Sequence, residues 1–361
     1  MRRPVHVAKA LMTTFVVALA VISAGCGTPS PPTAAASEGS GGKALGYSVE
    51  GASIRQAGVP YTPYGITIFG LARPNWASNV ASDLAQIGAV ASFWRGNVVR
   101  IQVAPPIFLA NSSGYVSALR REVGAALALR LNVIVSAQYQ SVGGLPGPDT
   151  GTVAFWRSVA GMYRGSQEVW FDLLNEPEQP NWNVRKHGGD GFVGMQTLVD
   201  TIRGVAPHNL IIAEGLRQAE TLLGVQGDLL HGSGIVYSVH PYLSPGWNTP
   251  NSWDANWGDL SSRIPVLVGK WGEYDERKPE CNVGTRTLVP QFLDYLRRHR
   301  IGLIAWALVP GVLIREGNLT EPTAFDPGVA YTCTGGLDIG PNAQRVGRDV
   351  LGLFTGSTSA M

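Results

Sequence analysis

The stretch VWFDLLNEPEQPNW, residues 169–182, begins as an apolar run and ends in an acidic turn. Five of its first six residues are apolar, and a short apolar run bounded by turn residues is typical of a strand buried on both faces. Glu176 and Pro177 follow this run almost at once. A carboxylate at the tip of a buried strand indicates a functional site, provided that other segments bring partner residues to it.

Seven further β-rich runs recur along the chain. They are PYGITIF (63–69), NVVRIQV (97–103), NVIVSAQ (132–138), NLIIAE (209–214), GIVYSVH (234–240), PVLVGKW (265–271) and GLIAWAL (302–308). Segments with helical character lie between most of them, at 79–94, 115–130, 195–205 and 288–300. Eight strand–helix units predict an α/β fold, a (β/α)8 TIM barrel in one domain. A doubly wound open sheet is the alternative, but no G-x-G-x-x-G follows any of these runs.

The chain has 361 residues, of which 45% are hydrophobic and 15% charged, so it can bury one large core. Its formal charge of +2 includes Arg2, Arg3 and Lys9, which belong to a predicted leader. Without these three, 25 basic residues face 26 acidic ones. This near-neutral balance gives no electrostatic support for nucleic-acid binding.

Residues 1–26 combine a basic start, an apolar run of fifteen residues and SAGC before a cysteine. The run is too short for a transmembrane helix, and the pattern resembles a bacterial lipoprotein signal with Ser23 in place of the usual Leu. We expect lipidation of Cys26, an extracytoplasmic location and a membrane anchor that does not span the bilayer. The alternative is an ordinary cleaved signal and a secreted protein. Residues 27–44 read as a flexible linker, and residues 45–361 as the catalytic domain.

Two cysteines remain in the exported chain, Cys281 and Cys333. In an oxidising compartment they most economically form a disulfide, which would close a loop of about 50 residues. The alternative is two free, buried thiols. A zinc site is poorly supported, because neither cysteine has a neighbouring Cys or His at ligand spacing.

TIM barrels place their working residues where the strands end. Glu176 follows the fourth strand, and Glu273 follows the seventh in VLVGKWGEYD. These two strands face each other across a closed barrel. Two carboxylates that converge on a pocket suit glycosidic cleavage, because one can protonate the departing oxygen while the other attacks or stabilises the sugar carbon.

Polar or aromatic residues also follow the other strands. They are Arg100, Gln138, Asn175, Glu214, His240, Tyr242 and Trp306. Arg100 can keep the nucleophilic carboxylate ionised, and Asn175 can bond a sugar 2-hydroxyl. His240 and Tyr242 can orient a sugar, and Trp306 offers a flat face. Each residue alone is more often structural, but their joint appearance at strand ends favours a saccharide site.

The motifs NEP, HPY and GEY after strands four, six and seven resemble those of glycoside hydrolase family 5, a retaining (β/α)8 family. VVRIQ and IAWAL also fall where that family has its Arg and its platform Trp, and the resemblance extends over residues 55–355. It implies that Glu176 is the general acid/base and Glu273 the nucleophile, with carboxyl groups about 5–5.5 Å apart. The implied substrate is an oligo- or polysaccharide, such as a β-linked glucan or mannan. No cofactor or metal is expected, and we expect a monomer.

One departure from the family pattern occurs after strand three. The chain reads IVSAQYQS, with Gln138 and Tyr139 where the family commonly has a histidine. This replacement could alter the choice of substrate, slow turnover or abolish activity. One alternative to a hydrolase is therefore a carbohydrate-binding lipoprotein on a degenerate barrel. A metal-dependent enzyme with Glu176, Glu273 and His240 as ligands is another, without support from any metal motif. Glu214 is interpreted as a supporting residue.

Two long loops, 175–191 and 242–258, are rich in aromatic residues. They carry Trp182, Trp247, Trp253 and Trp257. These tryptophans could stack on sugars or could pack within their own loops, and the sequence leaves both readings open.

Overall fold

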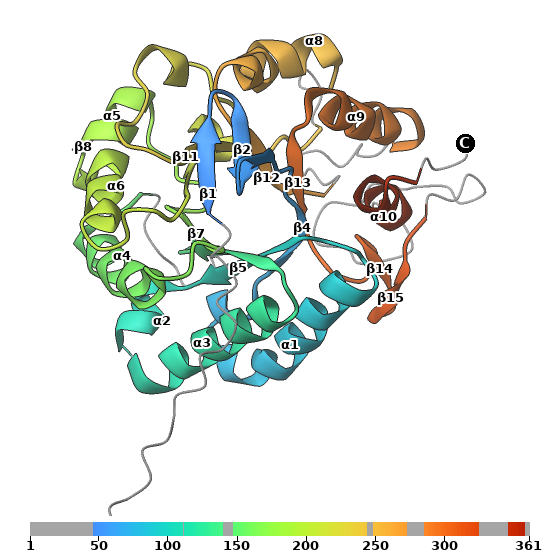
Figure 1. Cartoon of the computed structure of the whole chain (residues 1–361), viewed down its shortest axis with the longest axis horizontal. Helices are drawn as coiled ribbons and strands as arrows, with labels where there is room; N and C mark the ends of the chain where they lie inside the picture. Colours follow the sequence, from blue (N-terminus) through green and yellow to red (C-terminus); the bar gives the residue numbers. More distant parts are fainter. Residues whose placement is uncertain are drawn as a thin grey trace, which may run out of the picture. The chain divides into compact units, whose positions relative to one another are not determined.

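The computed structural model describes residues 46–110, 112–139, 147–243, 248–272, 285–324 and 346–357, all within one compact unit. Eight strands form a closed barrel in which every neighbouring pair is parallel, and β13 pairs with β4 to close it (Figure 1). The strands are β4 (Tyr64–Ile68), β5 (Val98–Val103), β6 (Asn132–Ala137), β7 (Val169–Asp172), β10 (Ile211–Glu214), β11 (Ile235–Val239), β12 (Val266–Trp271) and β13 (Gly302–Ala305). The predicted (β/α)8 barrel is therefore confirmed, with each strand inside its predicted segment.

Helices surround the barrel (Figure 1). The longer ones are α1 (Trp76–Ser92), α3 (Ser112–Ala128), α4 (Thr150–Tyr163), α6 (Met195–Arg203), α9 (Thr285–His299) and α10 (Gly347–Thr355). The short ones are α2 (Pro105–Ala110), α5 (Trp182–His187), α7 (Leu216–Ala219) and α8 (Pro250–Trp253). Helix α4, absent from the predicted set, begins at a capping box in which Asp149 and Thr152 satisfy each other's backbone N–H groups.

The barrel interior changes from apolar to polar along the strands, because alternate residues of a strand share a face. The apolar layer consists of Val98, Ile134, Trp170, Ile212, Val236, Leu267 and Ile304. Two positions further along five of the strands, the layer above it holds Arg100, Ser136, Asp172, Glu214 and Ser238, all buried. Charged groups are thereby concentrated toward the carboxyl ends of the strands, the end that we call the mouth.

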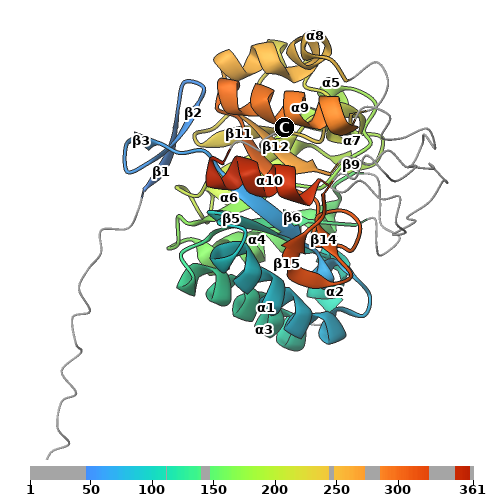
Figure 2. The same cartoon turned by 90° about the vertical axis from the view of Figure 1, so that its right-hand side faces the viewer.

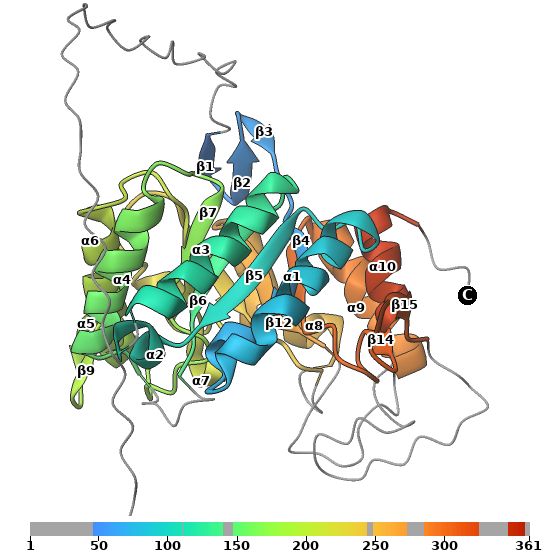
Figure 3. The same cartoon turned by 90° about the horizontal axis from the view of Figure 1, so that it is seen from below.

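A three-stranded antiparallel sheet closes the opposite end of the barrel (Figures 2 and 3). It consists of β1 (Tyr47–Glu50), β2 (Ser53–Gln56) and β3 (Val59–Pro60). Tyr47 and Ile54 pack against the apolar layer, and Tyr47 donates a hydrogen bond of 2.9 Å to Asn132 at the start of β6. Two small hairpins, β8 (Gly188–Gly189) with β9 (Phe192–Val193) and β14 (Ile314–Arg315) with β15 (Asn318–Pro322), lie outside the barrel sheet.

Glycines permit the closest approaches between the strands at the barrel seam. A Cβ on Gly65 of β4 would lie 2.0 Å from the carbonyl oxygen of Val98 on β5. A Cβ on Gly302 of β13 would lie 2.5 Å from the carbonyl oxygen of Pro63. Backbone atoms cannot yield at such distances, so both positions require glycine.

Three of the four loop tryptophans pack within the protein. Trp182 is buried and donates a hydrogen bond of 2.7 Å to the carbonyl oxygen of Asp228. Trp253 and Trp257 are buried against the ring of Tyr295, with centroids 5.2 and 5.6 Å away. For these three residues the loop-packing interpretation is correct and the sugar-stacking one is wrong.

Several predictions concern residues outside the described ranges. They are the lipidation of Cys26, the pairing of Cys281 with Cys333, and the roles of Glu273 and Trp247. These stay predictions. Within the described residues, no helix has the length and apolar composition needed to cross a bilayer.

Candidate active site

Glu176 stands at the mouth of the barrel, four residues after the end of β7. Leu173 and Leu174 continue the buried run, and the Asn175 N–H donates to the carbonyl oxygen of Ala137 at the end of β6. Glu176 then takes a left-handed backbone conformation, with φ of 50°, and its N–H donates to the Glu214 carboxylate. A left-handed non-glycine residue is uncommon and often marks a functional position. The turn ends the strand and leaves the Glu176 side chain at the mouth, 13% exposed.

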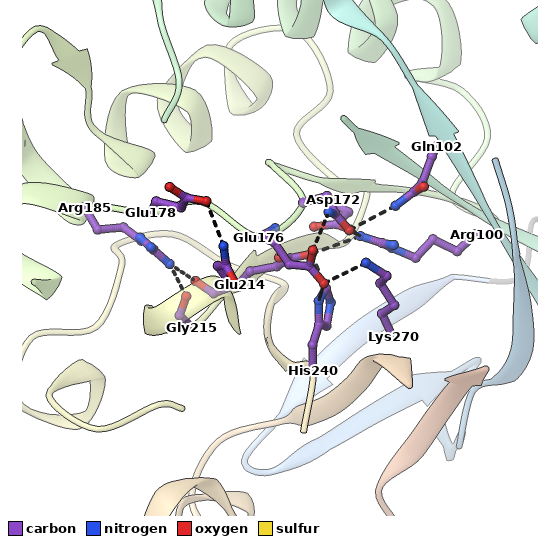
Figure 4. A network of polar contacts seen from close by, with 12 residues as sticks. Arg100, Gln102, Asp172, Glu176, Glu178, Arg185, Glu214, Gly215, His240 and Lys270 are labelled. Carbon is purple, nitrogen blue, oxygen red and sulfur yellow. Dashed lines mark hydrogen bonds and ion pairs between the residues drawn. The ribbon is translucent and has the colours of Figure 1, made fainter. Parts of the chain in front are cut away.

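Two groups from the far side of the barrel contact the Glu176 carboxylate (Figure 4). Lys270 of β12 donates from Nζ to Oε1 over 2.7 Å, and Nδ1 of His240, which follows β11, lies 2.9 Å from the same oxygen. The other oxygen accepts a bond of 3.3 Å from the Asn175 amide. Glu176 is thus fixed by residues from three strands.

Arg100 organises the layer beneath Glu176. Its Nε and Nη2 donate to Asp172 over 2.9 and 2.6 Å, and Nη2 also reaches Glu214 at 2.9 Å. The same nitrogen donates to Asn175 Oδ1 over 3.0 Å, as does Gln102 Nε2. Because the Asn175 Oδ1 accepts both of these bonds, the Asn175 amide nitrogen is directed at the Glu176 carboxylate. The cluster around Arg100 therefore orients Asn175.

Opposite charges control protonation across this cluster. Burial alone would raise the pKa of Glu176, but the charges of Lys270 and His240 outweigh burial and hold that pKa far below its ordinary value. Burial would likewise raise the pKa of Glu214, yet His240 and Arg100 lower it. Burial would lower the pKa of His240, but Glu214, 3.2 Å from its Nε2, and Glu176 raise it. The cluster therefore favours two carboxylates and a charged imidazole.

The remaining predicted site residues also lie at strand ends. Gln138 is buried directly after β6, and Tyr242 and Trp306 are half-buried beyond β11 and β13. The Trp306 ring stacks on Phe69 at 4.7 Å, and Lys270 Nζ lies 4.6 Å from its centroid. Trp306 therefore already contacts Phe69 and Lys270 at the mouth, and its role as a flat surface for a sugar stays a prediction.

The structure adds residues that the sequence analysis did not identify. Among the described residues the carboxylate partners of Arg100 are Asp172 and Glu214, and its expected role toward the nucleophilic carboxylate stays a prediction because Glu273 lies outside those residues. Asp172 and Gln102 were missed, although each is a polar residue at an alternate position of an otherwise apolar run. Lys270 was also missed.

Arg185 of α5 is a further residue that the sequence did not point to. It is fully buried, and its guanidinium donates to the carbonyl oxygens of Pro177, Glu214 and Gly215. Burial lowers its pKa to about 10. Arg185 therefore links the loop that carries Glu176 to the loop after β10.

The mouth thus combines a carboxylate, an aromatic ring and hydrogen-bonding side chains, the kinds of group that line sites for small polar ligands. Among the residues placed by the structure, no group of three His, Cys, Asp or Glu side chains is arranged to bind a metal ion.

Comparison with known proteins finds the same fold in cellulases. The chain is 21% identical over 239 residues to endoglucanase Z of Dickeya dadantii (strain 3937), covering 64% of this chain and 53% of that protein. It thus spans about half the length of that curated relative. The catalytic domain of Thermobifida fusca endoglucanase Cel5A superimposes with a TM-score of 0.65 at 16% identity, over 86% of this chain and 97% of that one.

A second solved structure has a bound sugar. The β-glucanase SdGluc5_26A of Saccharophagus degradans, in complex with cellotetraose, superimposes with a TM-score of 0.64 at 18% identity, over 87% of this chain and 94% of that one. The family model for cellulase (glycosyl hydrolase family 5) matches residues 55–311, more than half of the chain and almost all of the barrel. The chain therefore belongs to glycosyl hydrolase family 5, the cellulase family.

Proposed function

We propose that the mouth of the barrel binds a β-linked glucan, mannan or related glycoside and hydrolyses its glycosidic bond with retention of configuration. Glu176 is the general acid/base of this proposal, and Glu273 is its nucleophile. The observation that carries the proposal is the placement of Glu176: a backbone turn, Asn175 and His240 hold one carboxylate at the mouth.

The surroundings of Glu176 support a sugar as the ligand. The Trp306 ring lies beside Lys270, which contacts the Glu176 carboxylate, and the Asn175 amide nitrogen donates to the same carboxylate. The relatives named above are endoglucanases and a β-glucanase, one of them in complex with cellotetraose. A β-linked glucan is accordingly the first substrate class to test.

A second candidate function is saccharide binding without turnover. Lys270 favours it, because an ammonium group 2.7 Å from Glu176 opposes the proton transfer that a general acid must perform. The altered strand-three end at Gln138 points the same way.

The experiment that separates the two candidates is a screen of the purified protein on aryl β-glycosides and soluble polysaccharides, with proton NMR to identify the first anomer released. Hydrolysis with retention that is lost in both Glu176→Gln and Glu273→Gln supports the proposed mechanism. Binding of cellotetraose without any release of reducing ends supports the second candidate. Absence of both binding and hydrolysis would refute a saccharide site.

We also propose attachment to the outer face of a membrane through a lipid on Cys26. The support is the sequence of residues 1–26. Cys26→Ser should release the protein into the soluble fraction, and metabolic labelling with a radioactive fatty acid should label only the unmodified chain.

A further inference from the structure

Lys270 takes an unusual position for a cation on a buried strand. Its side chain is only 10% exposed, and it extends from β12 into the mouth toward Glu176. The pairing of β12 with β13 shifts register between Val268 and Trp271, and such a bulge redirects side chains. Trp271 consequently packs outward against Phe292, while Lys270 is directed into the site.

Lys270 and Glu176 face each other from the seventh and fourth barrel strands. Retaining hydrolysis needs two carboxyl groups about 5–5.5 Å apart on either side of the sugar. A glutamate side chain is one bond shorter than lysine, about 1.2 Å in an extended chain. A glutamate at position 270 would therefore place the nearest oxygens about 4 Å apart and the carboxyl carbons about 6 Å apart, which brackets the required separation.

The ion pair also determines the charge of Glu176. A general acid must carry a proton before it can donate one. Lys270 and His240 both hold Glu176 as a carboxylate, although burial alone would favour the protonated form. Below it, Asp172 and Glu214 are paired with Arg100.

We propose that Lys270 restrains hydrolysis at this site, because its ammonium group is paired with Glu176 across the mouth, at a place where a carboxylate would stand at catalytic separation. A nucleophile at that place is an alternative to the proposed Glu273. This inference rests on the proposed saccharide site. It makes Lys270 a positioning residue whose removal increases turnover.

The test compares the full chain with three variants on 4-nitrophenyl β-cellobioside and cellotetraose. Lys270→Glu should raise kcat at least tenfold, with little change in KM, and should extend activity to higher pH. The double variant Lys270→Glu/Glu176→Gln should lose this gain. Lys270→Arg, which keeps the cation, should not show this increase in kcat. A Lys270→Glu variant that melts normally and is no faster than the unmodified chain would overturn the inference.

A second measurement serves if Lys270→Glu does not fold. The protonation of Glu176 can be followed by carbon-13 NMR of its carboxyl signal, which is assigned by its absence in Lys270→Met/Glu176→Gln. In Lys270→Met this signal should titrate at least one pH unit higher than in the unmodified chain. An unchanged titration refutes the restraint.

Failure of the proposed function has a different signature. In that case neither the unmodified chain nor Lys270→Glu binds cellotetraose by calorimetry. If the unmodified chain binds cellotetraose and cleaves it as fast as Lys270→Glu does, the proposed function stands and the restraint by Lys270 is wrong.

Discussion

Glu122→Gln is expected to make the fold markedly less sensitive to alkaline pH. Glu122 on α3 is fully buried beside Asp83 on α1, which is 2% exposed. Burial raises the pKa of Glu122 to about 9, and the neighbouring negative charge of Asp83 adds to the rise. Burial also raises the pKa of Asp83, to about 6, although a hydrogen bond from Glu122 opposes this. At neutral pH the proton of the pair therefore resides on Glu122.

The magnitude follows from proton linkage. The ordinary pKa of Glu122 is 4.5, so between this value and about 9 the folded chain retains a proton that the unfolded chain releases. The free energy of unfolding then falls by about 1.4 kcal/mol for each pH unit of increase. Between pH 6.5 and 8.5, above the pKa of about 6 of Asp83, this amounts to about 3 kcal/mol. The amide introduced by Glu122→Gln would keep a hydrogen-bond donor toward Asp83 and would carry no titrating proton.

Urea unfolding followed by tryptophan fluorescence at pH 6.5 and 8.5 measures this difference. The stability of Glu122→Gln relative to the unmodified chain should rise by about 3 kcal/mol between the two pH values. Glu316→Gln, which alters an exposed carboxylate between β14 and β15, is the control and should show no such rise. Equal pH dependence in Glu122→Gln and the unmodified chain would refute the assignment of a shared proton to this pair.

Four other substitutions test the packing and the site. Arg100→Met should lower stability by about 3–5 kcal/mol in urea unfolding, because it leaves two buried carboxylates without their cation. Trp253→Ala should lower the free energy of unfolding by about 3–5 kcal/mol and leave the affinity for cellotetraose unchanged. Trp306→Ala should leave the melting temperature nearly unchanged and weaken cellotetraose binding about tenfold in calorimetry. The reverse pattern would contradict the assignment of these two tryptophans. Gly65→Ala should lower the melting temperature by the equivalent of at least about 1–3 kcal/mol, since its Cβ would overlap the Val98 carbonyl, and an unchanged melting curve would contradict that geometry.

The barrel could be predicted from the sequence because its strands are short apolar runs buried on both faces. Each run is local, and eight of them between helical segments leave few architectures. Helix α4 was missed because its start depends on a capping box and its sequence contains glycines at 151 and 161. The sheet formed by β1, β2 and β3 was missed because its strands are only two to four residues long.

The site could be predicted in part. Residues that directly follow strands, such as Glu176 and His240, could be placed at the mouth from topology alone. Lys270 could not, because its direction depends on the bulge in β12, which breaks the alternation of faces. Glu273, two residues beyond the end of β12, stays a prediction. The burial of Trp253 and Trp257 depends on Tyr295, a contact between segments far apart in the chain.

The small sheet that seals the base of the barrel has a mechanical consequence. The described chain begins at Gly46, immediately before β1, on the side farthest from Glu176. A force applied to the chain at Gly46 would therefore act on the sealed base, where Tyr47 and Ile54 are anchored among apolar side chains. The opposite rim lies away from this point, so a long polymer could cross the mouth without meeting the base of the barrel.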